Sequence, residues 1–173
     1  MPVTRQDEFE QVAMVHSRSL LRVASRLTLD RSAAEDLVQE TLLGAWRGFH
    51  RFQTGTNARA WLFRILFNNF YAQARKAKRA ADSSADASQL AANGFRVQTD
   101  RLEALAVAAA LDQLAAEHRA VLLLGVVEGF TCQEMSEILS IPLGTIMSRL
   151  SRARRALRER LEGEPKVCAR SAK

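Results

Sequence analysis

Apolar residues recur along the chain with the three-to-four-residue spacing of amphipathic helices, and they do so in two blocks. In the first block this spacing predicts helices over 4–29, 32–49 and 57–78. Thr4 with Asp7 is placed to open the first helix, and Ser32 with Glu35 has the signature of a capping box. Thr56 or Asn57 is placed to cap the third helix. The first block is therefore predicted to be helical throughout.

The second block predicts helices over 100–111, 116–127, 131–139 and 145–161. Thr131 and Glu134 form a capping box at the start of a short helix, Pro142 and Gly144 then break the chain, and Thr145 is expected to cap the last helix. A short helix, a tight turn and a longer arginine-rich helix are typical of a helix-turn-helix.

Residues 80–99 are small and polar, with no pattern that would bury a helix face. We therefore expect an all-α chain of two small helical domains, 1–79 and 100–164, joined by a flexible linker over 80–99 and followed by a short tail at 165–173. The helix-turn-helix lies in the second domain.

The net charge of +6 is modest, but its distribution is uneven. No acidic residue occurs between Thr41 and Ala81, a stretch that carries eight Arg and Lys residues, and six arginines of 149–160 face only Glu159. Two basic zones favour two contacts with a polyanion, most readily a nucleic acid. Ordinary solvated helix faces are the alternative.

The seam of the last helix is formed by Ile146, Leu150, Ala153, Leu157 and Leu161, spaced by three or four residues. This seam turns Ser148, Ser151, Arg152 and Arg155 outward, with Arg149 beside them. Hydroxyls and guanidiniums near a helix N-terminus suit major-groove reading of DNA. A structural helix with a solvated basic face would show the same pattern.

Two further surfaces are candidates for binding. Aromatic residues are concentrated between Trp46 and Tyr71 and interleaved with arginine, a combination that can stack unpaired bases, although most of these rings are expected to be core. The helix after Ser32 presents an outer face that mixes acid, amide and an apolar side chain, formed by Asp36, Gln39, Glu40, Leu43 and Arg47. That face would suit a basic helix of another protein, and it is equally compatible with a solvated face.

Several classes of function are disfavoured. Cys132 and Cys168 lie far apart and the three histidines are isolated, so no zinc site, disulfide framework or other metal or cofactor site is indicated. No phosphate-binding loop or nucleophile with its base is recognisable, so no enzyme is predicted. No apolar run approaches the length of a membrane span, which predicts a cytoplasmic protein without membrane insertion.

Three segments together resemble the extracytoplasmic-function sigma factors of bacterial RNA polymerase. They are AEDLVQET at 34–41 followed by Ala45 and Trp46, NARAWLFRI at 57–65, and IPLGTIMSRLSRAR at 141–154. The resemblance spans about residues 8–162 and implies a promoter −10 domain followed by a −35 domain. It departs at Met147, where many relatives carry lysine, so one phosphate contact is expected to be absent.

The resemblance also implies roles for particular residues and partners. The face with Asp36, Gln39, Glu40, Leu43 and Arg47 would bind the clamp helices of the largest polymerase subunit. The melted −10 strand would be held by Arg51, Phe52, Asn57, Arg64, Asn68, Tyr71, Arg75 and Lys76. The −35 element would be read by Thr145, Ser148, Arg149, Ser151, Arg152 and Arg155. An anti-sigma factor is implied as a further partner.

The alternative is a two-domain helix-turn-helix regulator that acts without being a polymerase subunit. Such a regulator would be expected to dimerise or to carry a ligand pocket in its first domain. The acid-free aromatic stretch and the Asp36 face fit neither expectation well.

Overall fold

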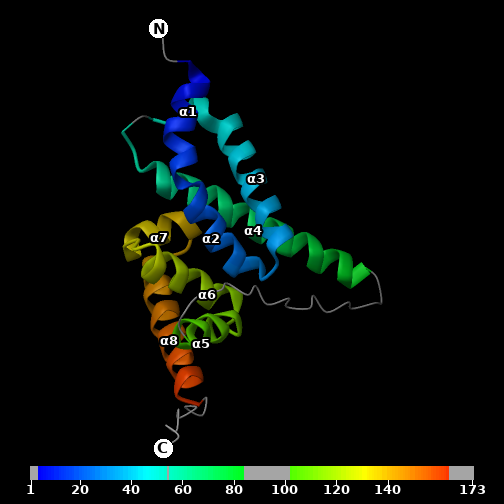
Figure 1. Cartoon of the computed structure of the whole chain (residues 1–173), viewed down its shortest axis with the longest axis vertical. Helices are drawn as coiled ribbons and strands as arrows, with labels where there is room; N and C mark the ends of the chain where they lie inside the picture. The colour runs from blue at the N-terminus through cyan, green and yellow to red at the C-terminus, as the bar shows by residue number, and fades with distance from the viewer. Residues whose placement is uncertain (1–3, 54, 84–101, 164–173) are drawn as a thin grey trace, which may run out of the picture.

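The computed structural model describes residues 4–53, 55–83 and 102–163, and within these ranges every regular element is a helix. The first helical group contains α1 (Arg5–Ala13), η1 (Met14–His16), α2 (Ser17–Thr28), α3 (Arg31–Gly48), η2 (Phe49–Arg51) and α4 (Ala58–Ser83). The second helical group contains α5 (Leu102–Asp112), α6 (Ala116–Leu122), the π-helical turn η3 (Leu123–Val127), α7 (Cys132–Leu139) and α8 (Leu143–Gly163). The predicted all-α class is confirmed (Figure 1).

The first group packs α2, α3 and α4 around a shared apolar core. Its fully buried side chains include Leu20, Leu37, Leu62, Phe63 and Phe67. These residues fall at the helical spacing that the sequence showed, which is why each helix turns one face inward. The outer faces of α3 and α4 are thereby left to solvent.

The first predicted helix is interrupted. A 3₁₀ turn, η1, separates α1 from α2, and the hydroxyl of Ser17, the first residue of α2, donates back to the Met14 carbonyl at 2.7 Å. Helix α2 then ends at Leu29, whose φ of 58° is in the left-handed region. The single helix predicted over 4–29 is therefore wrong in its middle, because serine bonding to the backbone offers the chain a local alternative to the helix.

Helix α3 starts one residue earlier than predicted and with a different cap. Asp30 accepts a hydrogen bond from the Ala33 backbone N–H at 2.8 Å and is the N-cap. Glu35, which the predicted capping box assigned to Ser32, instead pairs with Arg31 at 2.8 Å. Aspartate is at least as good an N-cap as serine, so two overlapping signals were resolved in favour of Asp30.

In the second group the predicted capping box at Thr131 and Glu134 is confirmed, but the start of the last helix is not. Helix α8 begins at Leu143, and the Pro142 carbonyl accepts the backbone N–H groups of Thr145 (2.9 Å) and Ile146 (3.1 Å). Thr145 thus lies in the first turn rather than at the cap. Proline lacks an N–H and suits the residue at which a helix opens.

Helix α4 continues to Ser83, beyond the predicted end near Lys78. The remainder of the predicted linker, 84–99, and the predicted tail, 165–173, lie outside the described residues. None of the described helices is long and apolar enough to cross a membrane.

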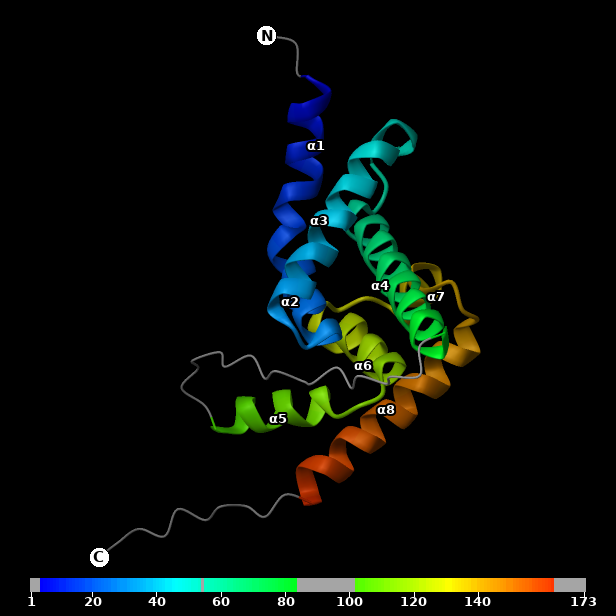
Figure 2. The ribbon, with the colours of Figure 1, turned by 90° about the vertical axis from the view of Figure 1, so that its right-hand side faces the viewer.

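The two helical groups pack directly against each other. Helix α7 lies on α4, and α6 lies on the end of α2 (Figures 1 and 2). Phe63 of α4 meets Phe130, just before α7, edge to face with ring centroids 5.3 Å apart. The sequence did not indicate this contact, because each block was interpreted by itself.

Candidate polymerase and nucleic-acid interfaces

The predicted protein-binding face of α3 points outward. All five of its residues, Asp36, Gln39, Glu40, Leu43 and Arg47, are exposed, and the Leu43 side chain is 54% exposed. Glu40 accepts a hydrogen bond from the amide of Gln73 on α4 at 2.9 Å. Opposite this face, Leu37 and Ala45 are fully buried, so α3 is amphipathic with its mixed polar and apolar face free.

Trp46 lies only at the edge of the core, whereas most of the rings between Trp46 and Tyr71 were expected to be core. Its side chain is 37% exposed, its ring meets Phe9 at 5.2 Å, and the Arg5 guanidinium lies 5.0 Å above it. The indole therefore covers the edge of the core beside α1 rather than filling it. It also adds an aromatic surface next to Arg47 at the end of α3.

The residues assigned to −10 strand capture lie mainly along the outer face of α4. Arg64, Asn68, Arg75 and Lys76 are exposed, and Arg51 is exposed in η2 before the helix. No carboxylate belongs to the segment between Thr41 and Ala81, so every charge that this segment contributes to the face is positive. Such a face can follow a phosphate backbone.

Asn57 has a structural role at the start of α4. Its Oδ1 accepts the Ala60 backbone N–H at 3.0 Å, which resolves the choice between Asn57 and Thr56 as the cap. Its side-chain amide donates to Oε1 of Glu134 in α7 at 2.9 Å. An assigned −10 residue is therefore engaged by the second helical group.

The two aromatic residues assigned to base stacking are half-buried. The Phe52 ring is tilted against Trp61 with centroids 4.8 Å apart, and Tyr71 meets Phe70 edge to face with centroids 5.3 Å apart. Burial raises the pKa of the Tyr71 phenol. Both rings thus contribute to the core while keeping an exposed part.

On α8 the predicted seam and outer face are separated as expected. Ile146, Leu150 and Ala153 are buried and Leu157 and Leu161 are half-buried. The opposite face exposes Ser148, Ser151, Arg152 and Arg155, with Thr145 half-buried at its start. The helix therefore presents hydroxyls and guanidiniums together, the side chains that major-groove reading uses.

Two residues at the start of this face differ from the others. The Arg149 guanidinium pairs with Glu117 of α6 at 2.9 Å, and its side chain is 28% exposed. Met147 is 57% exposed among the polar side chains. In this arrangement Arg149 is held toward α6, whereas Arg152 and Arg155 face solvent.

A buried carboxylate joins the two helical groups. Glu128, which follows η3, has a side chain with no exposed surface and pairs with Arg22 of α2 and Arg59 of α4, each at 2.6 Å. The Arg59 guanidinium also donates to the Glu128 carbonyl and lies 4.4 Å from the Phe130 ring centroid. Both guanidiniums are needed to offset the cost of burying this charge.

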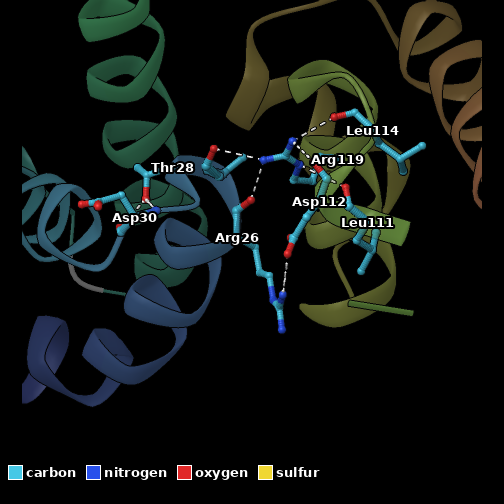
Figure 3. Close-up of polar contacts among 8 residues, drawn as sticks. Arg26, Thr28, Asp30, Leu111, Asp112, Leu114 and Arg119 are labelled. Atoms are coloured by element: carbon cyan, nitrogen blue, oxygen red, sulfur yellow. Dashed lines mark hydrogen bonds and ion pairs between the residues drawn. The ribbon is translucent and has the colours of Figure 1, made fainter. Parts of the chain in front are cut away.

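Arg119 of α6 forms a second connection between the groups (Figure 3). Its guanidinium is buried and donates only to backbone carbonyls. Three lie in its own group and two at the end of α2: Leu111 (3.2 Å), Asp112 (2.8 Å), Leu114 (2.9 Å), Arg26 (2.9 Å) and Leu27 (3.3 Å). Burial lowers the pKa of Arg119, while the nearby Asp112 acts in the opposite direction. Arg26 itself pairs with Asp112 at 3.1 Å.

Sequence reasoning assigned no role to Glu128, Arg119 or Arg22. The single signal available was that Glu128 closes an apolar run, where a charged residue requires a partner if it is buried. Its two partners lie 106 and 69 residues earlier in the chain, so no local pattern could identify them.

In the described part of the chain, no group of three or more His, Cys, Asp or Glu residues is arranged to hold a metal.

Comparison with known families matches both groups in order. Residues 13–80 match the model of sigma-70 region 2, and residues 104–157 match that of sigma-70 region 4.

Characterised proteins match most of the chain. The ECF RNA polymerase sigma factor EcfG of Rhodopseudomonas palustris is 36% identical over 91% of this chain and 86% of its own length. The ECF RNA polymerase sigma factor SigL of Mycobacterium tuberculosis is 39% identical over 85% of each.

Two solved structures share the arrangement. The sigma factor RpoE of Bartonella quintana, crystallised with the anti-sigma factor NepR, aligns with a TM-score of 0.80 at 36% identity over 91% of this chain and 99% of that chain. CnrH, in complex with the cytosolic domain of CnrY, aligns with a TM-score of 0.69 at 27% identity over 93% of this chain and 92% of that chain.

Proposed function

The chain belongs to the ECF sigma factors of RNA polymerase, and from this membership we propose how its two helical groups divide the work of promoter recognition. Residues 1–79 bind core polymerase and the −10 element, and residues 100–164 read the −35 element. The observation that carries this division is the match of region 2 to the first group and region 4 to the second.

Core polymerase docks on the outer face of α3. Asp36, Gln39 and Glu40 supply carboxylates and an amide for a basic partner helix, and the exposed Leu43 supplies apolar contact beside Arg47. The partner is the clamp-helix pair of the largest polymerase subunit. Complementary charge on such a surface governs encounter and register more than it governs total affinity.

The melted −10 strand follows α4. The exposed cations Arg51, Arg64, Arg75 and Lys76 track phosphates, Asn68 bonds to base edges, and Phe52, Tyr71 and Asn57 act at the two ends of the strand. Because unpaired bases present their faces, partly exposed rings beside cations can bind them. Single-stranded capture requires no enzymatic step, and we propose no catalytic role and no cofactor.

The −35 element is read by α8. Arg152 and Arg155 are exposed and available to guanine edges or phosphates, Ser148 and Ser151 lie beside them, and Arg149 must leave Glu117 to contribute. Thr145 lies in the first turn, where backbone N–H groups can meet a phosphate.

An anti-sigma factor holds the protein inactive in the cytoplasm until a signal releases it. Support comes from the similar arrangement of RpoE, whose structure was solved with NepR, and of CnrH, solved with a domain of CnrY. The alternative of a regulator that acts without polymerase is not favoured, since the similarity to sigma factors extends over both helical groups.

Charge reversal on α3 tests the polymerase-binding face. Asp36→Arg should weaken binding to core polymerase by about 1–2 kcal/mol, because it places a cation opposite a basic partner. The fold should persist, since Asp36 is exposed and points away from the core. Competitive binding of labelled chain to purified core polymerase measures the effect.

Glu10→Arg, at an exposed position of α1, is the matched control and should bind as the wild type does. If Asp36→Arg also binds core polymerase with unchanged affinity, the α3 face is not the docking surface.

A further inference from the structure

The first turn of α4 is covered by acidic side chains from the second helical group. Glu128 lies between Arg22 and Arg59, and Glu134 accepts the amide of Asn57, two residues before Arg59. The pKa of Glu134 is lowered mainly by hydrogen bonds from Thr131, with Asn57 and Arg59 adding to the same direction. Two carboxylates thus approach the end of α4 at which the proposed −10 strand begins.

The arrangement of Arg22 and Arg59 around Glu128 has the form of an anion site. Two guanidiniums from different helices converge on one carboxylate at 2.6 Å each, and the carboxylate is excluded from solvent. Arginine side chains that converge in this way bind phosphate as readily as carboxylate, because both anions offer paired oxygen acceptors. Both arginines belong to the first group, while the second group supplies the carboxylate and, against Arg59, the Glu128 carbonyl and the Phe130 ring.

The segment around Arg59 lacks acidic residues, so another anion can take the place of Glu128 at this site. Neither α4 nor the turn before it carries a carboxylate between Thr41 and Ala81, so Arg59 has no acidic partner within its own segment. If the groups separate, Arg59 and Arg22 lose Glu128 together. Two adjacent unneutralised guanidiniums would then attract the nearest polyanion.

We propose that Arg22 and Arg59 form a binding site for a backbone phosphate of promoter DNA, which Glu128 occupies while the two helical groups are packed together. The proposal rests on the proposed function, in which the first group binds the −10 strand. It makes DNA and the second helical group competitors for the same two arginines. The closed chain therefore binds the −10 strand weakly until the groups separate.

The competition predicts a gain of binding when the internal anion is neutralised. Glu128→Gln in the full-length chain should bind single-stranded DNA with the −10 sequence selected by the wild-type holoenzyme about three- to tenfold more tightly, because the site is free for a larger fraction of time. The gain should vanish in the double variant Glu128→Gln with Arg59→Gln. Fluorescence anisotropy over a series of salt concentrations measures both.

Asp112→Asn is the matched control that weakens only the contact between the two helical groups. It removes the Arg26–Asp112 pair between the groups and leaves Arg22 and Arg59 untouched, so its gain should stay below about twofold. The proposal is overturned if Asp112→Asn gains as much as Glu128→Gln, or if Glu128→Gln gains equally without Arg59. Either result would mean that opening, and not a freed phosphate site, increases binding.

A second experiment uses the holoenzyme and does not depend on the packing of the two helical groups against each other. With core polymerase bound, Arg59→Gln and Arg22→Gln should each weaken promoter binding at every sequence and reduce the slope of log affinity against log salt by about 0.7–1. Unchanged affinity and slope in both variants would overturn the proposal. If the wild-type holoenzyme itself selects no promoter, the proposed function fails, and that outcome is separate from the result for the arginines.

Discussion

Arg119→Met should lower the free energy of unfolding by about 3–5 kcal/mol, the largest stability effect that we expect from one substitution in this chain. Arg119 is only 6% exposed, and its guanidinium satisfies five backbone carbonyls on both sides of the contact between the helical groups. Methionine fills similar volume but donates nothing, so several carbonyls would lose their partner away from solvent. Urea unfolding of the full chain, followed by circular dichroism, measures the change.

Arg158→Met on the exposed side of α8 is the control and should change stability by less than about 0.5 kcal/mol. A decrease below about 1 kcal/mol for Arg119→Met would contradict the role given to Arg119. The carbonyls it contacts would then have to be satisfied equally well by water.

The second large effect is expected on promoter affinity, when arginines of α8 that are proposed to read the −35 element are replaced. Arg152→Ala or Arg155→Ala should cost about 1–3 kcal/mol of promoter affinity, because each removes an exposed guanidinium that contacts the duplex. A base-reading arginine would relax preference at one −35 position, whereas a phosphate-contacting one would weaken all promoters alike and reduce the salt slope by about one. Sequencing of promoters selected by each variant holoenzyme distinguishes these cases.

Arg158→Ala, about two turns beyond Arg152 on α8, should retain the wild-type preference and serves as the control. Ser148 and Ser151, between the arginines and the helix start, are expected to have smaller effects because neutral hydrogen bonds are weaker than charged ones. If Arg152→Ala and Arg155→Ala both leave the selected −35 sequence and its affinity unchanged, α8 is not the reading helix.

Much of the local structure followed from periodicity. The seam of Ile146, Leu150 and Ala153 was evident from spacing alone, and the structure buries all three. The all-α class and the family resemblance are likewise confirmed. Periodicity succeeds here because burial of one helix face is a local consequence of the order of residues.

Helix starts were predicted less well, because neighbouring polar residues compete for the same role. Ser32 was predicted to cap α3, but the folded backbone uses Asp30, two residues earlier. Thr145 looked like a cap, yet Pro142 opens the helix earlier. Such differences amount to about 1 kcal/mol, too little for sequence patterns to rank.

The contact between the helical groups was not predictable from the sequence. Glu128 lies 69 residues from Arg59, and Arg119 bonds to carbonyls that any residue type could supply. The acid-free stretch that contains Arg59 was interpreted as a polyanion contact, and the structure adds an internal anion, Glu128, to that interpretation. The pairing depends on tertiary packing, which brings distant segments together without a local signal.

Run-off transcription with purified core polymerase and a pool of genomic promoter fragments tests the central claim most directly. With the chain added, discrete transcripts should start downstream of a shared pair of −35 and −10 sequences, and they should disappear when the chain is omitted. If the chain binds duplex DNA without polymerase and no promoter-specific transcript forms with it, the account of a sigma factor is contradicted.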